Sequence, residues 1–277
     1  MRHCLCGSLR GPSQIRIMFM IKKGFYIQKS TVIALFLREI KTRFGKYRLG
    51  YCWALLEPVL HLFVLWVVFD YVMQRAMSDI SFPVFLLNGL IPYFLFSNIA
   101  TRSINAFEAN QGLFNYRPVK PVDTVIARAV LETFIYTMVY FLLMALLLLN
   151  GEVIDKINLI ELCTVGFLLV VFSFGLGLIV MVVGNTFPEM EKFLPVIIKP
   201  LYFISCIMFP LNSVPEEYWG WLLWNPLLHV VELARESLAI NYQSEGASLA
   251  YLGFSTLIVL FVGLLLYRSR EEAMLTS

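Results

Sequence analysis

Six apolar stretches, most of them about 20 residues long, follow a strongly basic segment of about 50 residues. At a rise of about 1.5 Å per residue, about 20 helical residues cross the roughly 30 Å hydrocarbon core of a bilayer. Inside that core a single segment can satisfy its backbone hydrogen bonds only as a helix. The sequence therefore predicts an all-α polytopic membrane protein with six transmembrane helices. The expected spans are residues 52–73, 82–101, 125–149, 159–183, 193–209 and 247–267.

The composition is that of a membrane protein. Of the 277 residues, 59% are hydrophobic and 15% are charged, and the mean hydropathy is +0.74. A water-soluble domain would need more charge on its surface. The first 30 residues lack the apolar core and cleavage site of a signal peptide, so we expect the first span to act as an uncleaved insertion signal. Met18 and Met20 are alternative start positions to Met1.

The distribution of lysine and arginine predicts the orientation. Eleven basic residues precede the first span against Glu39 alone, and Arg268 and Arg270 follow the last span. Positive charge concentrates on the cytoplasmic side of membrane proteins, so both termini are predicted to be cytoplasmic. The longest outward loop, residues 211–246, carries five glutamates and Arg235 as its only basic residue. We therefore expect a multi-pass protein of the bacterial inner (cytoplasmic) membrane.

Residues 31–48 combine apolar side chains at helical spacing with basic side chains on the other faces. This pattern predicts an N-terminal amphipathic helix in the membrane interface, after a poorly ordered cytoplasmic segment, residues 1–30. Two roles remain open for this helix: topological anchoring at anionic lipid headgroups, or reception of an anionic, lipid-linked substrate. The residues assigned to substrate access at the interface are Arg38, Lys41, Arg43, Lys46, Arg48, Trp53 and Glu57.

Several polar groups fall inside the predicted spans, where a charged group should face a partner or a water-filled path. They are Glu57, His61, Asn88, Arg128, Glu132, Glu161 and Lys199. Small residues recur on one side of the fourth span, at Gly166, Ser173, Gly177 and Gly184. Because small residues allow helices to approach closely, this stripe predicts helix packing within the chain or against a second copy.

Residues 49–58 read Leu-Gly-Tyr-Cys-Trp-Ala-Leu-Leu-Glu-Pro and follow the sequence Arg-Glu-Ile-Lys-Thr-Arg-Phe at residues 38–44. These motifs resemble the start of the first span in type-2 ABC exporter permeases that export capsular polysaccharide. Cys52 stands where that family usually has a larger apolar residue. The resemblance covers about residues 31–268, which implies one transmembrane domain, residues 31–268, followed by a cytoplasmic tail, residues 269–277.

The outer loop contains a segment, residues 219–224, that is too short to span and is flanked by Pro215 and Pro226. Together with the one-sided apolar segment that follows, it predicts short re-entrant or interfacial helices before the last span. Its aromatic side chains fit either an interfacial belt or a gate. The resemblance favours a periplasmic gate. The residues assigned to that gate are Trp219, Trp221, Trp224, Asn225, Pro226, Glu232 and Arg235.

The loop between the second and third spans, residues 102–121, mixes apolar and charged side chains. A short amphipathic helix here would project apolar side chains into a cytoplasmic partner, and an ordinary interfacial loop is the alternative. In the resembled family this segment is the coupling helix, which sits in a cleft of the ATP-binding subunit. The residues assigned to ATPase coupling are Phe107, Glu108, Asn110, Leu113, Phe114, Tyr116 and Arg117.

The energy source is expected on another chain. No Gly-x-x-x-x-Gly-Lys-Ser/Thr loop occurs, since Gly45 and Lys46 are followed by Tyr47. The three histidines are far apart in sequence and form no hydrolytic constellation, so we expect neither an enzyme nor catalytic residues. The single Cys-x-Cys pair lacks a second pair of ligands, so no metal site is predicted. This chain is expected to bind no cofactor, with ATP and Mg held by the partner ATPase.

The resemblance implies a homodimeric permease that works with two ATP-binding subunits. Its cargo would be a lipid-linked acidic polysaccharide, moved from cytoplasm to periplasm. Membrane lipids and periplasmic and outer-membrane export proteins are expected partners, and nucleic acid is not. The alternatives are the same exporter with another cargo (O-antigen, teichoic acid, a lipid or a drug) and a membrane-embedded glycan or acyl transferase. The transferase would need clustered His or Asp residues at the membrane surface, which we do not find.

Overall fold

The computed structural model describes residues 12–44, 50–69, 80–114, 119–152, 154, 156–240 and 242–276, and every regular element within them is helical. The longer helices are α1 (Pro12–Phe44), α2 (Gly50–Val68), α3 (Phe82–Ser103), α4 (Pro121–Leu149), α5 (Leu159–Thr186), α6 (Met190–Ile204), α8 (Pro226–Glu236) and α9 (Leu249–Thr276). The short elements are η2 (Glu108–Leu113), η3 (Leu211–Ser213), η4 (Glu216–Tyr218) and α7 (Trp219–Leu222).

Four helices, α3, α4, α5 and α9, are long and apolar enough to cross a bilayer. They correspond to the second, third, fourth and sixth expected spans, which confirms a helical membrane bundle. α2 contributes a shorter apolar segment, Leu56–Val68. The end of the first expected span, residues 70–73, lies outside the described residues.

α6 is shorter than the fifth expected span. It ends at Ile204 after 15 residues, so the prediction of a helix that continues to Phe209 is wrong. The chain turns at Cys206, whose φ of 54° lies in the left-handed region. The carbonyls of Cys206 and Ile207 accept hydrogen bonds from Arg235 of α8, which stabilises the turn. A tertiary contact therefore ends the helix.

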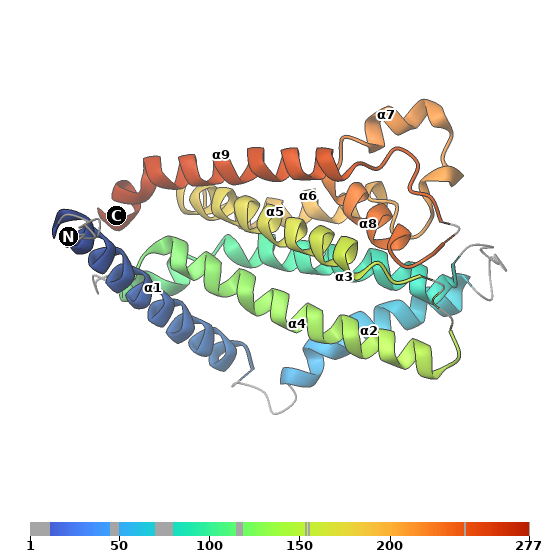
Figure 1. Ribbon diagram of the computed structural model, residues 1–277, viewed down its shortest axis with the longest axis horizontal. Helices are drawn as coiled ribbons and strands as arrows, with labels where there is room; N and C mark the ends of the chain where they lie inside the picture. The colour runs from blue at the N-terminus through green and yellow to red at the C-terminus, as the bar shows by residue number, and fades with distance from the viewer. Residues whose placement is uncertain are drawn as a thin grey trace, which may run out of the picture.

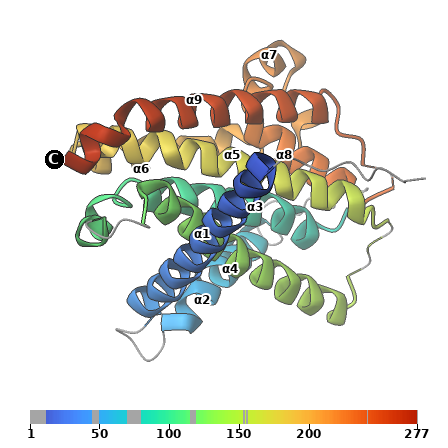
Figure 2. The same ribbon diagram turned by 60° about the vertical axis from the view of Figure 1, so that its left-hand side comes forward.

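α1 begins at Pro12, earlier than the helix expected from residue 31. Proline suits the first turn of a helix, and no further proline or glycine occurs before Gly24. α1 thus includes residues 12–30, for which the sequence predicted a poorly ordered segment. α1 and α4 run in the same direction, since Gln28 contacts Asp123 and Arg43 contacts Glu132 further along both helices. Figure 2 shows α1 crossing the face of the bundle.

α3 lies at the centre of the bundle and contacts α2, α4, α5, α6 and α8. Apolar residues on several sides of this helix, among them Phe85, Leu90 and Ile99, are fully buried. A helix that is apolar all round is expected to be surrounded by other helices. Among the small residues of α5, Gly184 approaches the α3–α4 turn, because a Cβ there would lie 2.6 Å from Ile104 Cγ1.

The two ends of the bundle differ in content (Figure 1). α1 begins and α9 ends at one end, which we call the terminal end and which also holds the α3–α4 turn. α7 lies at the opposite end, the α7 end. The predicted coupling and gate residues are therefore on opposite ends of the molecule.

Candidate functional site

The predicted coupling residues lie on the turn between α3 and α4. Phe107 is buried and stacks on Phe114, with ring centroids 5.0 Å apart and ring planes at 18°. Both rings belong to an apolar cluster that includes Val125 of α4, Leu178 of α5 and Tyr267 of α9. The predicted outward projection is therefore wrong for Phe107, which other parts of the same chain bury, whereas Phe114 is only half-buried.

The outer surface of this turn is polar. Glu108 and Gln111 of η2 are exposed, whereas Asn110 is buried and donates over 2.8 Å to a backbone carbonyl of the same turn. The other predicted coupling residues are the half-buried Leu113 and, outside the described residues, Tyr116 and Arg117. A partner that approaches this turn meets carboxylate and amide groups.

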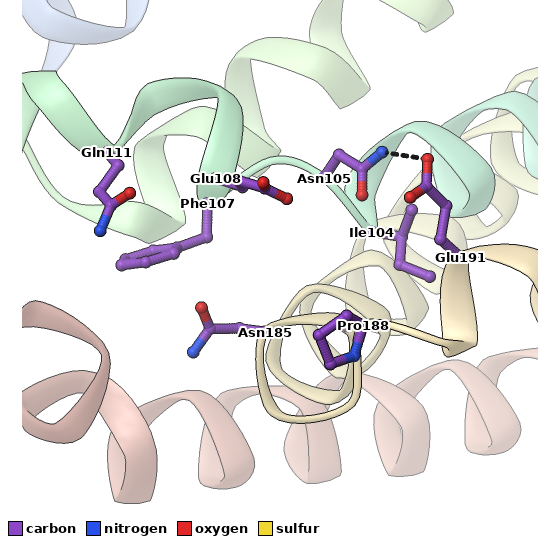
Figure 3. A pocket seen from close by; sticks show the side chains of 9 residues that line it. Ile104, Asn105, Phe107, Glu108, Gln111, Asn185, Pro188 and Glu191 are labelled. Atoms are coloured by element: carbon purple, nitrogen blue, oxygen red, sulfur yellow. Dashed lines mark hydrogen bonds between the residues drawn. The ribbon is translucent and has the colours of Figure 1, made fainter. Parts of the chain in front are cut away.

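A pocket of about 220 Å³ opens beside η2, and we call it the η2 pocket (Figure 3). One wall is the α3–α4 turn and the other is formed by the end of α5 and the start of α6. Asn105 Nδ2 donates to Glu191 Oε1 over 2.7 Å and joins the two walls. The lining residues are Ile104, Asn105, Phe107, Glu108, Gln111, Gly184, Asn185, Pro188 and Glu191. The pocket thus presents several hydrogen-bonding groups around a small hollow.

Arg38 connects α1 with η2. Its guanidinium donates to Asn110 Oδ1 and, over 3.2 Å, to the carbonyl oxygen of Ala109. Since charged hydrogen bonds are stronger than neutral ones, this contact holds η2 against α1. A residue predicted for substrate access is therefore in contact with the predicted coupling segment.

The other residues predicted for substrate access are dispersed. Lys41 is exposed on α1, Glu57 is exposed on α2, and the Arg43 side chain is largely buried against α4. Lys46 and Arg48 lie outside the described residues, and the side chain of Trp53 is not described. Of those that the structure describes, Arg38 and Lys41 are three positions apart on α1, whereas Glu57 belongs to a different helix.

Two ion pairs join α1 to α4. Arg43 Nη1 lies 2.5 Å from Glu132 Oε1, and Arg128 Nε lies 2.9 Å from Glu39 Oε1. On each helix the two charged residues are four positions apart, so they share a face. Because the helices run in the same direction, each glutamate meets an arginine. The basic α1 helix is thus partly neutralised by the bundle itself.

Arg102, at the end of α3, is a third cation, with its Nε 3.0 Å from Glu132 Oε1. These groups surround a pocket of about 280 Å³, which we call the arginine pocket. It is lined by Glu39, Arg43, Thr101, Arg102, Asn105, Arg128, Leu131 and Glu132. Of these, Arg43 was predicted as a substrate-access residue, and Arg128 and Glu132 were predicted to face a partner or a water-filled path. The two complementary pairs at a spacing of four were the signal that could have revealed the pocket.

The aromatic residues predicted for the gate lie at the α7 end. Trp221 and Trp224 are 84% and 81% exposed, whereas Trp219 donates its Nε1–H to a backbone carbonyl over 2.9 Å. Asn225 caps α8 by accepting a backbone N–H over 3.1 Å, and Pro226 occupies the first turn. Local sequence therefore explains why a four-residue helix is followed at once by an 11-residue helix.

Arg235 lies in the interior and is fully buried with Glu232. Its guanidinium is 2.9 Å from Glu232 Oε1 and donates to the carbonyls of Cys206 and Ile207 over 3.0 and 2.8 Å. It also lies 3.4 Å from the ring centroid of Phe85. Buried charge is tolerated when it is paired and fully hydrogen-bonded, as here. Arg235 therefore fastens α8 to α3 and to the turn after α6.

Tyr242 completes this cluster by donating its hydroxyl to Glu232 Oε2 over 2.6 Å. Burial, and after it the charge of Glu232, raises the pKa of Tyr242, so the hydroxyl remains protonated and remains a donor. Both oxygens of Glu232 are thus satisfied. The predicted gate residues consequently fall into two groups, an exposed aromatic group and a buried ionic cluster.

Within the part of the chain that the structure describes, no group of three or more His, Cys, Asp or Glu side chains lies close enough to hold a metal ion. The polar clusters at both ends of the bundle consist instead of arginine, glutamate and amide or hydroxyl groups. Such groups bind and orient anions and hydroxyls.

The sequence matches the ABC-2 type transporter family over residues 30–239. Among curated relatives, the polysialic acid transport protein KpsM of Escherichia coli is 64% identical over 93% of this chain and 100% of its own length. The capsule polysaccharide export inner-membrane protein BexB of Haemophilus influenzae is 28% identical over 90% of this chain and 94% of its own. The capsule polysaccharide export inner-membrane protein CtrC of Neisseria meningitidis is 25% identical over 86% of this chain and 90% of its own length.

Proposed function

Because the chain belongs to the ABC-2 type transporter family, we propose that it is the permease subunit of an ATP-driven exporter of lipid-linked capsular polysaccharide. The observation that carries the proposal is the identity of 64% with a polysialic acid transport protein along nearly the whole chain. Two further relatives are named inner-membrane proteins of capsule export. The family and the relatives also confirm the expectation of a transport subunit whose ATPase is a separate protein. The two inner-membrane relatives confirm the expected location.

In this proposal the terminal end faces the cytoplasm and the α7 end faces the periplasm. The excess of lysine and arginine before α2 and after the apolar part of α9 supports this orientation. α2 and α6 would complete the six spans, with α7 and α8 as short helices that do not cross. α1, extended to residue 12, would follow the cytoplasmic interface and lead into one transmembrane domain, residues 31–268.

The α3–α4 turn is the proposed contact with the ATP-binding subunit, which would hold ATP and Mg. Support comes from the exposed Glu108 and Gln111 and from the η2 pocket between them and α5. A protein partner with a donor-bearing side chain would fit this polar rim. Through Arg38, a movement of η2 would reach α1 directly. Two permeases and two ATPases would form the exporter, with the route for the sugar chain enclosed between the two permeases.

The exposed Trp221 and Trp224 at the α7 end are the proposed periplasmic gate surface, where flat aromatic rings can stack on sugar rings. The ion cluster of Glu232 and Arg235 would hold that surface in place from inside the bundle. Periplasmic and outer-membrane export proteins would receive the polymer beyond this gate.

The proposed function is tested by deleting the gene and locating the long-chain acidic polysaccharide of the cell. The expected result is polymer retained in the cytoplasm with an empty surface, restored by the intact gene. A normal capsule in the deletion strain would contradict the capsule-exporter function and leave another cargo as the explanation.

The proposed coupling contact has a separate test. Gln111→Trp should crowd the η2 pocket and reduce the amount of ATPase that co-purifies with the permease. The matched control is Gln243→Trp, an exposed glutamine outside the α3–α4 turn. Equal recovery of the ATPase with both variants would place the contact elsewhere.

A further inference from the structure

The arginine pocket has a charge excess that its ion pairs do not cancel. Three guanidinium groups, Arg43, Arg102 and Arg128, surround it, against the two carboxylates of Glu39 and Glu132. Arginines at close range repel one another unless anions lie between them. The pocket therefore favours a ligand that carries one further negative charge.

Arg102 is the group best placed to meet such a ligand. Its side chain is 42% exposed, whereas those of Arg43 and Arg128 are largely buried. Its Nε forms an ion pair with Glu132 Oε1 at 3.0 Å and donates a hydrogen bond to Asn98 Oδ1 over 3.4 Å. No hydrogen bond from its two terminal nitrogens is present among the described residues. A guanidinium with free terminal N–H groups can bind a phosphate or carboxylate through two hydrogen bonds.

Glu132 adds a second requirement on the ligand. Its side chain is 1% exposed; Arg43 donates to Oε1, and Arg102 Nε lies 3.0 Å from the same oxygen. The other oxygen, Oε2, is buried and has no hydrogen-bond partner among the described residues. A buried carboxylate oxygen is stabilised by a donor, and a hydroxyl group of a ligand supplies one. The preferred ligand thus combines an anion with hydroxyls.

The position of the pocket restricts the source of that ligand. Its residues come from the last turn of α3, the turn that follows it, the first half of α4 and the last two turns of α1, in the half of the bundle nearer the terminal end. In the proposed orientation this level coincides with the lipid headgroups of the cytoplasmic leaflet. A pocket of about 280 Å³ accommodates a headgroup but no polymer.

We propose that the arginine pocket binds a lipid headgroup that carries one anionic group and adjacent hydroxyls. Arg102 holds the anion, and Glu132 Oε2 accepts a hydroxyl. Two sources share this chemistry: phosphatidylglycerol of the bilayer, and the acidic sugar next to the lipid anchor of the exported glycan. The second source rests on the proposed function, whereas the first does not.

The test compares lipid binding by the full-length purified chain and its variants, titrated with phosphatidylglycerol or phosphatidylcholine and read by native mass spectrometry. Arg102→Gln is expected to weaken phosphatidylglycerol binding roughly tenfold, the loss of about one charged hydrogen bond. Arg102→Lys keeps the charge but not the paired donors and should give an intermediate loss. Lys29→Gln is the matched control, since it removes one exposed positive charge from α1 outside the pocket and outside the residues predicted for substrate access.

The outcomes separate the two sources. A loss of phosphatidylglycerol with Arg102→Gln but not with Lys29→Gln identifies the bilayer lipid. Unchanged phosphatidylglycerol, together with less of the extracted acidic glycolipid on Arg102→Gln, identifies the glycan. If Arg102→Gln and Lys29→Gln behave alike with both probes, the pocket is no headgroup site and the proposal is overturned. A normal capsule in the deletion strain would overturn the exporter function without affecting the phosphatidylglycerol result.

Discussion

Glu232 near the α7 end and Glu132 near the terminal end are both buried glutamates paired with arginine, and their surroundings differ. Glu232 uses both oxygens, one for Arg235 and one for the hydroxyl of Tyr242, and the whole cluster is buried. Glu132 uses one oxygen for two arginines, and one of those, Arg102, reaches the surface.

This difference separates a structural cluster from a candidate binding site. A saturated ion cluster in the interior gains nothing from a ligand and loses much when one member is removed. An incomplete cluster with an exposed cation has hydrogen-bonding capacity to spare, and a ligand can use it. The predictions below test whether the two clusters divide in this way.

The largest effect is expected for Arg235→Ala. It leaves Glu232 charged and unpaired in the interior and frees two backbone carbonyls, so the free energy of unfolding should fall by about 3–5 kcal/mol. Thermal unfolding of the purified protein measures the change. Arg268→Ala, which removes an exposed arginine that is also paired with a glutamate, should change it by no more than about 1 kcal/mol. Similar losses for both variants would remove the distinction between buried and exposed pairs.

A smaller effect is expected for Gly184→Ala near the terminal end. A Cβ at Gly184 would lie 2.6 Å from Ile104 Cγ1 and 2.9 Å from its carbonyl oxygen, so the α3–α4 turn must shift. Crowding of this kind costs about 1–3 kcal/mol of unfolding free energy. Gly166→Ala, in the same helix with no atom within 4 Å, is the control and should be tolerated. The comparison is read from thermal unfolding and from ATPase co-purification.

At the α7 end, the free energy of unfolding should depend on pH through the buried side chain of His229. His229 is hydrogen-bonded at Nε2 to the Leu223 carbonyl and at Nδ1 to the Ser248 amide, and burial lowers its pKa. Since the unfolded chain takes up a proton below about pH 6.5 while the folded chain resists it, the unfolding free energy should fall as the pH falls through 6.5.

The size of the His229 effect is about 1 kcal/mol, the value of the Ser248 hydrogen bond that protonation removes. Unfolding curves between pH 7.5 and 5 for wild type and His229→Gln measure it. The difference between the two proteins should shrink at the acidic end. If the difference between the two proteins stays constant across this range, folding does not change the pKa of His229.

The smallest effect on stability is expected for Arg102→Gln, at about 0–1 kcal/mol, because the exposed side chain loses little and Arg43 still neutralises Glu132. The variant should unfold close to the wild-type temperature in the absence of added lipid. A loss as large as that of Arg235→Ala would mean that the arginine pocket is structural too.

Much of the fold follows from local patterns in the sequence. Long apolar runs predicted α3, α4, α5 and α9, and the Asn225-Pro226 pair marks the start of α8 because capping is a local interaction. The end of α6 was not predictable in this way, since Arg235 stabilises that turn from 28 residues away.

The candidate sites were only partly predictable for the same reason. The matching spacing of the two charge pairs is compatible with a contact between Arg43 and Glu132, but it does not select this partner, 89 residues away, from the other acidic residues of the chain. The aromatic pattern around Phe107 was read as an outward face, but the side chain is buried against α5 and α9. An amphipathic pattern shows that a segment has an apolar and a polar face. It does not show whether the apolar face packs against the same chain or against a partner.

The most direct test is surface polysaccharide per folded permease in a deletion strain that expresses wild type or Arg102→Gln. Wild type should restore the surface polymer, whereas Arg102→Gln should reach the same folded amount and leave polymer inside the cell. Equal surface polymer with both proteins, at equal folded amounts, would contradict a functional role for the arginine pocket.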